Sequence, residues 1–405
     1  MSCIVPLSTI QNKKYKYLLS YDDGSILKTI RIVDTVAYVP FNDGLSLNEF
    51  SLKKVNPIFK FIGNLNLDQE YVKNKTLSLL DKYKSVILSC YTGFGKTITS
   101  LNVACLKGSK ILIVLNKKVL FDQWSQAIYD FCGKHCTILD SKTNISIDEG
   151  FYLINVINIS KKPMYLLNSF DMVIIDEVHL IFSKKNFVNL LYLTPNYLLG
   201  LSATPYRNDN LNKLFELFFG KNNLISKPLF KTHIVNIIQT NFKPTITYTK
   251  DLRINWNAIL NEQAENIERN NLIVDIITKF KDRVFLVLVK RISQGEWLAK
   301  KLSEKREHVS TLFGKDKLFD KNCRILIGTN LKIGTGFDFT RLNTLLLAAD
   351  VVDYYLQFLG RVMRTPIEPV IFDFLDNNSI LLKHFYKRNA IYKKHGGIVQ
   401  KLTTF

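Results

Sequence analysis

The chain has 405 residues, and its 55 lysines and arginines exceed its 35 aspartates and glutamates to give a net charge of +20. Hydrophobic residues make up 47% and charged residues 22%, which is typical of a globular protein and excludes a largely disordered one. The longest apolar runs are far shorter than the roughly 18–20 residues that span a bilayer, and residues 1–14 lack the basic start of a secretory signal. Six cysteines without a disulfide-rich spacing predict a reducing, intracellular compartment. Membrane, secreted and fibrous classes are thus excluded, and the basic excess indicates a polyphosphate partner such as nucleic acid.

Two blocks of strands follow a short N-terminal region. Residues 1–55 alternate apolar and polar positions around turn signals, with short strands predicted at 15–19 and 36–39. From residue 84, fully apolar segments alternate with amphipathic ones, a pattern typical of a parallel sheet covered on both faces; the predicted strands are 86–88, 111–115, 151–154, 172–175 and 197–199. The pattern restarts with predicted strands 284–289, 324–327, 344–348 and 370–374. We therefore predict an α/β protein with a β-rich N-terminal appendage (1–55), two α/β domains (56–225 and 226–405) and a hinge near 221–230.

A glycine-bearing loop joins the first predicted strand of this series to a helix expected to begin near Ile98. It reads Ser89-Cys90-Tyr91-Thr92-Gly93-Phe94-Gly95-Lys96-Thr97. A strand, a loop ending in Gly-Lys-Thr and a helix form a phosphate cradle, because backbone N–H groups and the helix N-terminus attract anions. Lys96 is expected to reach the β- and γ-phosphates, and the Thr97 hydroxyl to bind Mg²⁺. The loop therefore predicts ATP and Mg²⁺ as cofactors, bound by residues 92–97.

An acidic pair follows the predicted buried strand 172–175, in the sequence Asp176-Glu177-Val178-His179. Acidic residues at the carboxyl end of such a strand face the ligand crevice of the sheet. ATP hydrolysis requires a carboxylate to hold Mg²⁺ and a neighbouring one to deprotonate water. We therefore assign Asp176 to the metal and Glu177 to the general base.

These motifs and five further segments resemble those of the superfamily 2 helicases and translocases over about residues 65–395. Residues 176–179 resemble a DExH box, and 200–207, with Ser202-Ala203-Thr204, resemble the motif that couples hydrolysis to nucleic-acid contact. Residues 65–69 resemble the segment whose glutamine recognises adenine, here Gln69, with Asn66 where an arginine is usual. Residues 111–124 look like motif Ia of the XPB and UvsW-like branch, with Asn116 in place of a typical proline.

Two segments of the second block complete the resemblance. Gly328-Thr329 and Gly334-Thr335-Gly336-Phe337-Asp338 resemble motif V, and residues 357–364 match the Q-x-x-G-R-x-x-R pattern of motif VI. The spacing of Arg361 and Arg364 predicts that both lie on one helical face, from which they could act as arginine fingers on the γ-phosphate. The sequences of residues 333–338, 342–348, 353–364 and 373–376 resemble those of XPB/UvsW-related helicases of large DNA viruses, a group that includes the transcript-release helicases.

The resemblance implies two tandem RecA-like domains and a nucleic-acid-stimulated ATPase. It assigns catalytic roles to Lys96, Asp176, Glu177, Gln357, Arg361 and Arg364; nucleotide contacts also to Gln69 and Asp338; coupling to His179, Ser202 and Thr204; and nucleic-acid contacts to Asn116, Lys117, Arg291 and Thr329. It favours DNA over RNA as substrate and 3′–5′ polarity. We further expect a monomer that binds transcription or replication machinery. We expect it in the cytoplasm or nucleus of an infected cell, or in the virion.

Several alternatives stay open from the residues themselves. An RNA helicase, a non-motor remodelling or binding subunit and a small-molecule kinase all share parts of the pattern. Trp124 could be an ordinary core residue, and the cluster Cys132-Gly133-Lys134-His135-Cys136 is better explained as a loop after a helix than as a metal site. The basic and aromatic segment 383–394 suits phosphate contact, although an amphipathic helix with Phe385 and Tyr392 packed inward explains it better.

Overall fold

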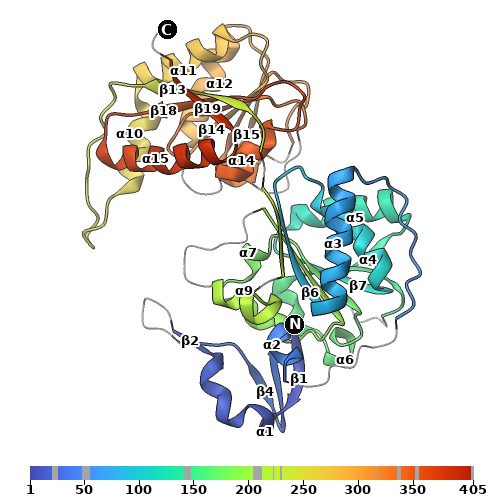
Figure 1. Cartoon of the computed structure of the whole chain (residues 1–405). Coiled ribbons are helices and arrows are strands. Elements are labelled where there is room, and N and C mark those ends of the chain that lie inside the picture. Colours follow the sequence, from blue (N-terminus) through green and yellow to red (C-terminus); the bar gives the residue numbers. More distant parts are fainter. Residues whose placement is uncertain are drawn as a thin grey trace. The chain divides into compact units, whose positions relative to one another are not determined.

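The computed structural model describes residues 1–20, 26–47, 55–140, 147–203, 212–221, 223–228, 230–316, 318–334, 339–351 and 355–402. The chain divides into two compact units, Met1–Lys227 and Pro228–Phe405, each built around a seven-stranded sheet (Figure 1). In the described part of the chain, no helix is long and apolar enough to cross a membrane.

The sheet of the first unit is parallel throughout, in the order β12-β6-β11-β10-β7-β9-β8. Its strands are β6 Ser85–Cys90, β7 Lys110–Leu115, β8 Cys136–Leu139, β9 Gly150–Asn155, β10 Met172–Ile175, β11 Tyr197–Ser202 and β12 Leu224–Lys227. The helices are α3 Leu67–Tyr83, α4 Lys96–Lys107, α5 Lys118–Cys132, a 3₁₀ helix at Val156–Lys161, α6 Met164–Leu167, α7 Val178–Ile181, α8 Phe187–Leu190 and α9 Asn212–Phe219.

Both faces of this sheet are buried, which is why its central strands are continuous apolar runs. Along β7, Ile113 packs into a core with side chains of α3, α4 and α5, whereas Leu112 and Val114 pack into a second core with side chains of α6 to α9. The covered sheet is therefore a rigid platform, and the carboxyl ends of its strands can hold side chains in fixed positions.

The N-terminal segment adds a small antiparallel sheet to the first unit. Its strands are β1 Ser2–Pro6, β4 Arg31–Val33 and β5 Val36–Pro40, next to a hairpin of β2 Leu18–Ser20 and β3 Ile26–Lys28. Short helices α1 Leu7–Ile10 and α2 Phe41–Leu45 complete it. Val5 and Phe41 share a core with Phe218 of α9, and the Ser2 N–H donates to the Leu193 carbonyl at 2.7 Å. The segment is thus packed against the first sheet through common apolar side chains.

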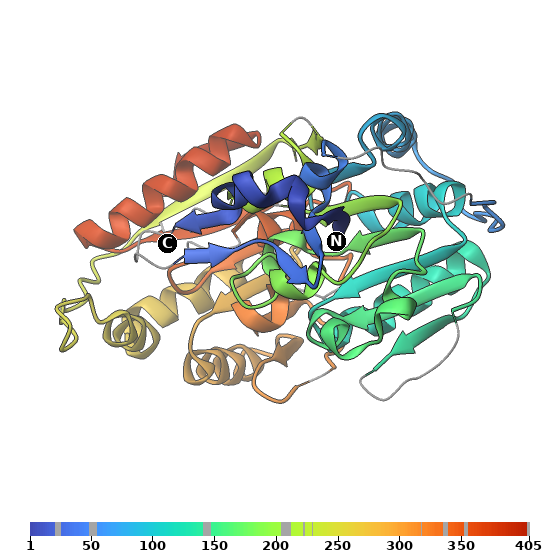
Figure 2. The ribbon, with the colours of Figure 1, turned by 90° about the horizontal axis from the view of Figure 1, so that it is seen from below.

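The sheet of the second unit is also parallel, in the order β15-β16-β14-β17-β18-β13-β19. Its strands are β13 His233–Gln239, β14 Phe285–Val289, β15 Val309–Leu312, β16 Ile325–Thr329, β17 Thr344–Leu347, β18 Val370–Leu375 and β19 Gly397–Lys401. The helices are α10 Trp256–Glu265, α11 Ile267–Lys279, α12 Ile292–Glu304, α13 Asn330–Gly334, α14 Tyr355–Val362 and α15 Ser379–Lys394. Helices α11 and α12 pack on one face, and α14 and α15 lie on the other (Figures 1 and 2).

The expected α/β class, the two parallel sheets and the β-rich N-terminal region are confirmed, and every strand predicted from residue 84 onward overlaps an observed strand. The strand predicted at 15–19 is wrong, because a 3₁₀ helix occupies Gln11–Tyr17 and only Leu18 and Leu19 enter β2. The segment predicted as a hinge at 221–230 contains β12, which pairs with β6, and the division between the units follows it at Lys227.

Candidate ATPase site

The phosphate loop has the geometry that its glycines allow. Gly93 and Gly95 both have φ near +94°, a left-handed conformation that L side chains rarely adopt. A Cβ added at Gly95 would lie 2.4 Å from Nε2 of Gln69, so a side chain at this position would displace the Gln69 amide. Helix α4 begins at Lys96, two residues earlier than expected, and no described side chain caps its first turn. Its leading N–H groups therefore remain available to an anion.

Lys96 lies across this loop. Its Nζ donates to the carbonyl oxygens of Cys90 at 3.0 Å and Tyr91 at 3.4 Å. Cys90, which replaces a more usual glycine or alanine, packs its thiol into the core beneath the loop, where burial raises its pKa to about 11 against the opposing charges of Lys96 and Lys227. The substitution is therefore accommodated by apolar packing.

Gln69 connects helix α3 to the phosphate loop. Its Oε1 accepts a hydrogen bond from the Asn66 N–H at 3.0 Å, and its Nε2 donates to the Phe94 carbonyl at 2.7 Å. The Asn66 side chain in turn accepts from the Gln69 N–H at 2.9 Å, which makes this pair a capping box at the start of α3. Both ends of the Gln69 amide thus make contacts within the protein. The capping role was missed, although Asn-x-x-Gln before a helix is a recognisable signal for it.

Asp176 follows β10 and is held through both carboxylate oxygens. Oδ2 accepts from the indole Nε1 of Trp124 at 2.9 Å, and Oδ1 accepts from the Glu177 N–H at 2.9 Å. Burial, and to a smaller extent the charge of Glu177, raise the pKa of Asp176 to about 6, although the Trp124 hydrogen bond and the Lys96 charge act against this rise. The carboxylate is therefore pre-oriented, and it binds a proton more readily than an exposed aspartate.

Glu177 has a backbone conformation that is rare for a side-chain-bearing residue. Its φ and ψ are 48° and 54°, in the left-handed region, at the point where β10 ends and the short helix α7 begins. Such conformations cost of order 1–3 kcal/mol and cluster at functional sites.

His179 links this acidic pair to the neighbouring strand. Its Nδ1 lies 2.9 Å from Oγ of Ser202 and 3.5 Å from Oε2 of Glu177, and both His179 and Ser202 are buried. Ser202 ends β11, which lies between β10 and β6 in the sheet. His179 and Ser202, two of the three predicted coupling residues, are therefore in direct contact, whereas Thr204 lies outside the described residues.

The predicted site residues of the first unit thus follow the carboxyl ends of four adjacent strands, at one edge of the sheet. In the order β6-β11-β10-β7, their carboxyl ends lead to the phosphate loop, to Ser202, to the acidic pair, and to Asn116 and Lys117. Burial lowers the pKa of Lys117, and the negative charge of Glu177 acts in the opposite direction. Lys117, predicted to contact nucleic acid, is therefore within electrostatic reach of the predicted general base.

Trp124 makes a contact that sequence reasoning missed. It ends the segment that resembles motif Ia, with a core position as the alternative; it is only 1% exposed, and its indole also donates a hydrogen bond to the carboxylate predicted to bind Mg²⁺. It lies on α5, the helix that follows β7, and β7 pairs with β10. That strand adjacency is the only signal that brings the two side chains together, and it is not visible in the local sequence.

The remaining predicted residues belong to the second unit. Gln357 and Arg361 are buried on α14, but the helix ends at Val362, so Arg364 lies beyond it. The expectation that both arginines share one helical face is therefore wrong. Pro366 supplies the reason, since it has no N–H to donate to the carbonyl of Val362, four residues earlier, and in a continuing helix its ring would clash with that carbonyl.

Two of the predicted nucleic-acid contacts are described in this unit. Arg291 donates to Oδ1 of Asn261 at 2.6 Å and of Asn257 at 2.9 Å on α10, and Thr329 ends β16. Asp338 lies outside the described residues.

The weaker sequence signals have structural explanations. Helix α5 ends at Cys132, Gly133 has a left-handed φ of 61°, and β8 begins at Cys136, so this cluster is a helix end and a turn. No group of three or more metal-ligating side chains is found in the described part of the chain. On α15, Phe385 and Tyr392 are buried, which confirms the amphipathic explanation of that segment.

Comparison with known proteins agrees with this geometry. Residues 62–207 match the family model described as "Type III restriction enzyme, res subunit". The chain is 44% identical over 440 aligned residues to the putative helicase 161L of invertebrate iridescent virus 6, and the alignment covers 99% of each protein. It is 30% identical to the putative helicase 055L of frog virus 3, over 78% of this chain and 74% of that one.

Two further similarities are more distant. The transcript termination protein A18 of Yaba-like disease virus is 27% identical, over 75% of this chain and 71% of the relative. The fold is similar to that of S. cerevisiae Dbp5 bound to RNA and ADP BeF3, with a TM-score of 0.57, 15% identity and coverage of 84% and 94%. The chain therefore belongs to the superfamily 2 helicases of large DNA viruses, a family of nucleic-acid-dependent ATPases.

Proposed function

We propose that this protein is an ATP-driven translocase or helicase that acts on DNA with 3′–5′ polarity in viral transcription, replication or repair. The observation that carries the proposal is the meeting of Lys96, the Asp176–Glu177 pair and the His179–Ser202 contact at one edge of the first sheet. These are the groups that an ATPase coupled to another ligand requires: a phosphate-binding cation, a metal carboxylate, a base and a connection leading away from them.

Each group has a defined task in hydrolysis. Lys96 and the N–H groups of the phosphate loop bind the triphosphate, and Glu177 accepts a proton from the attacking water. Thr97 and Asp176 offer the hydroxyl and carboxylate oxygens that Mg²⁺ prefers, and the two hydrogen bonds to Asp176 keep its carboxylate oriented for such an ion. When bound, Mg²⁺ would neutralise charge on the phosphates.

We assign nucleotide binding to residues 56–225 and the second helicase domain to residues 226–405. Arg361 and Arg364 would stabilise the charge that develops on the γ-phosphate, and Gln69 and Asp338 would contact the nucleotide. Asn116, Lys117, Arg291 and Thr329 would contact the polynucleotide backbone, with the remaining basic surface making that binding salt-sensitive. Thr204 would share the coupling role of His179 and Ser202.

The preference for DNA rests on the resemblance of motif Ia to the XPB and UvsW-like branch and on the viral relatives, one of which is named for transcript termination. An RNA helicase is the second candidate, favoured by the fold it shares with an RNA-bound protein. We further propose that the protein acts as a monomer inside infected cells, in contact with transcription or replication machinery.

The decisive experiment compares ATP hydrolysis with no polynucleotide, with single- and double-stranded DNA and with RNA of the same length. We expect stimulation by DNA that falls steeply as salt rises. Stimulation by RNA alone would reverse the substrate assignment, and no stimulation by any polynucleotide would refute the motor. Lys96→Ala, which lacks the phosphate-binding cation, is the matched background control. A strand-displacement assay with 3′- and 5′-tailed duplexes then tests polarity.

A further inference from the structure

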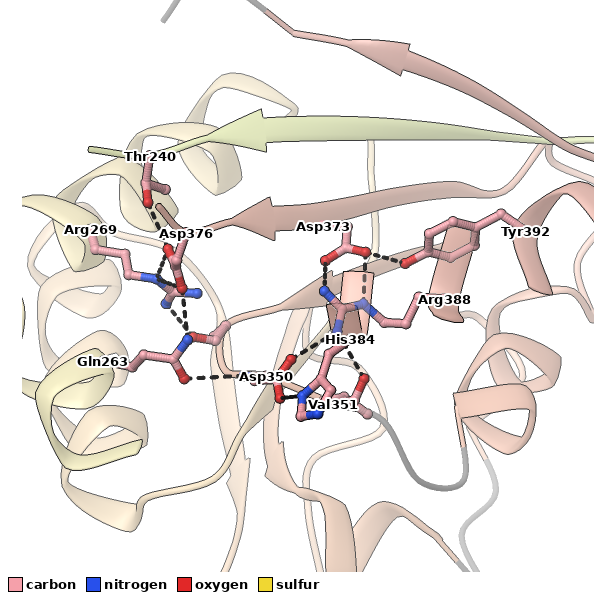
Figure 3. Close-up of polar contacts among 11 residues, drawn as sticks. Thr240, Gln263, Arg269, Asp350, Val351, Asp373, Asp376, His384, Arg388 and Tyr392 are labelled. Atoms are coloured by element: carbon pink, nitrogen blue, oxygen red, sulfur yellow. Dashed lines mark hydrogen bonds and ion pairs between the residues drawn. The ribbon is translucent and has the colours of Figure 1, made fainter. Parts of the chain in front are cut away.

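The second unit contains a buried network of charged side chains that no step of hydrolysis uses directly (Figure 3). Its centre is Arg388 of α15, which is 3% exposed. The Arg388 guanidinium donates from Nε and Nη2 to the two carboxylate oxygens of Asp373, each at 2.8 Å, and from Nη1 to Oδ1 of Asp350 at 2.9 Å. The same Nη1 donates to the carbonyl of Val351 at 3.1 Å. One side chain therefore joins β18 to the residues that follow β17.

Asp350 is held from several directions. Its Oδ2 lies 2.5 Å from Nδ1 of His384, its N–H donates to Oε1 of Gln263 at 3.3 Å, and its Oδ1 accepts from Arg388. The His384 ring stacks on Trp256, with 4.9 Å between ring centroids. Burial acts to raise the pKa of Asp350, but the hydrogen bond from His384 and the charge of Arg388 outweigh it, so the pKa is lowered. The segment that ends at Val351 is therefore fixed by charge-assisted hydrogen bonds.

The same helix also contacts the start of α14. Tyr355, the first residue of α14, packs its ring edge-on against Tyr392 of α15, with centroids 5.1 Å apart. The Tyr392 hydroxyl donates to Oδ2 of Asp373 at 2.5 Å, so Tyr392 is oriented by the carboxylate that also binds Arg388. Helix α15 thus holds the chain both before α14, at Asp350 and Val351, and at the first residue of α14.

Stability alone does not explain such a network. A buried ion pair is often no more stabilising than apolar side chains of similar volume, because desolvation of its charges offsets their attraction. A fully hydrogen-bonded network does impose one geometry, since each donor has a defined direction. An arginine at this position has the further advantage that its planar fork reaches Asp373, Asp350 and a carbonyl at once, which a lysine ammonium cannot do.

We propose that Arg388, with Tyr392, is a positioning residue for motif VI: it fixes the place of α14 and so of Gln357, Arg361 and the following Arg364. The inference rests on the proposed role of Arg361 and Arg364 in hydrolysis. It extends that role to a helix outside the recognised motifs. A displacement of about 1 Å in a catalytic group can cost about 100-fold in rate. Loss of the contacts that Arg388 and Tyr392 make should therefore lower kcat rather than weaken ATP binding.

The first test measures kcat and KM for ATP at saturating DNA, together with melting temperature, for Arg388→Lys and Tyr392→Phe. We expect Arg388→Lys to lower kcat roughly 10- to 100-fold with the KM for ATP unchanged, and Tyr392→Phe to do so more weakly. Leu302→Ala, in the core beneath α12, is the control that lowers melting temperature without touching the network. If kcat falls equally in the control at matched loss of stability, or does not fall in either network variant, the proposal is wrong.

A double-mutant cycle separates this inference from the function on which it rests. If Arg388 acts through motif VI, Arg388→Lys should slow the Arg361→Ala variant by a clearly smaller factor than it slows the unaltered protein. Fully multiplied effects would overturn the positioning role while leaving the arginine finger intact. A normal kcat for Arg361→Ala would refute the finger and the positioning role together. Should Arg388→Lys fail to fold, Tyr392→Phe takes its place in the cycle.

Discussion

The indole Nε1 of Trp124 donates a hydrogen bond to Oδ2 of Asp176, with 2.9 Å between the two atoms. The contact joins helix α5, whose first half belongs to the segment similar to motif Ia, to the first acidic residue of the DExH box, which directly follows β10. It means that the carboxylate assigned to Mg²⁺ is oriented by a buried side chain 52 residues earlier in the chain. A change at Trp124 should therefore alter Mg²⁺ binding as well as packing in the core.

Replacement of Trp124 by phenylalanine keeps an aromatic ring in the core but removes the donor to Asp176. We expect the Mg²⁺ concentration for half-maximal ATPase activity to rise roughly tenfold, as is usual when a partner of a metal ligand is lost. The measurement is a Mg²⁺ titration of ATP hydrolysis at saturating DNA. Ile128→Val, a buried change one turn later on α5, serves as control and should leave the Mg²⁺ requirement unaltered. An unchanged requirement in Trp124→Phe would show that the hydrogen bond has no role at the metal.

Replacement of Glu177 by glutamine removes the proposed base and keeps its size. Turnover should fall by at least about 100-fold, whereas ATP binding should persist because Lys96 and the phosphate loop are untouched. A fluorescent ATP analogue measures binding and phosphate release measures turnover. The exposed Glu149→Gln provides a control for the loss of one negative charge in the same unit. Retained turnover in Glu177→Gln would mean that another group activates water.

Substitutions of the two residues of the α3 capping box, Asn66 and Gln69, should have different effects on stability and on nucleotide binding. Asn66→Ala removes the cap and should lower the free energy of unfolding by about 1 kcal/mol, with the KM for ATP unchanged. Gln69→Ala also removes the hydrogen bond to the Phe94 carbonyl, and the KM should rise roughly fivefold because the phosphate loop loses one net bond of about 1 kcal/mol. Thermal melting and ATPase kinetics measure the two effects. Equal KM values in the two variants would contradict a role for Gln69 at the loop.

The Asp350 carboxylate should make the second unit sensitive to acid. Its pKa in the folded state is lowered, because the hydrogen bond from His384 and the charge of Arg388 outweigh the opposing effect of burial. A folded pKa below the unfolded value means that this group stabilises the fold above about pH 4 and that the contribution is lost as pH falls through the folded pKa.

Asp350→Asn should therefore lower the melting temperature by about 10 °C at pH 7, with a difference from the unaltered protein that shrinks below about pH 4. Melting curves at pH 7, 5, 4 and 3 measure this, with the exposed Asp282→Asn as control. A constant difference across that range would show that the charge of Asp350 is not what stabilises the network.

Interior strands were predictable, and edge strands were not. The strands found from sequence are buried on both faces and are therefore continuous apolar runs, as in β10, where all four residues are buried. In the two seven-stranded sheets, the missed strands β8, β12, β15 and β19 are the edge strands, where partial exposure breaks that pattern. The fifth missed strand, β13, is interior, but Asn236 interrupts its apolar run. The Asn236 Oδ1 accepts a hydrogen bond from Gln400 of β19 at 2.8 Å, which makes a buried polar residue acceptable there.

Parts of the candidate site were likewise predictable from the sequence, and other parts were not. Local sequence alone determined the phosphate loop, the acidic pair and the family, because the spacing of Gly95, Lys96, Asp176 and Glu177 is itself the chemical requirement. Only the tertiary structure decided which distant side chains meet: Trp124 with Asp176, His179 with Ser202, and Arg388 with the chain before α14. The physical reason is that parallel strand order brings together the ends of segments far apart in the chain, and no local pattern encodes that order. The structure was also needed to show that α14 ends before Arg364, because a spacing of three residues does not show where a helix ends.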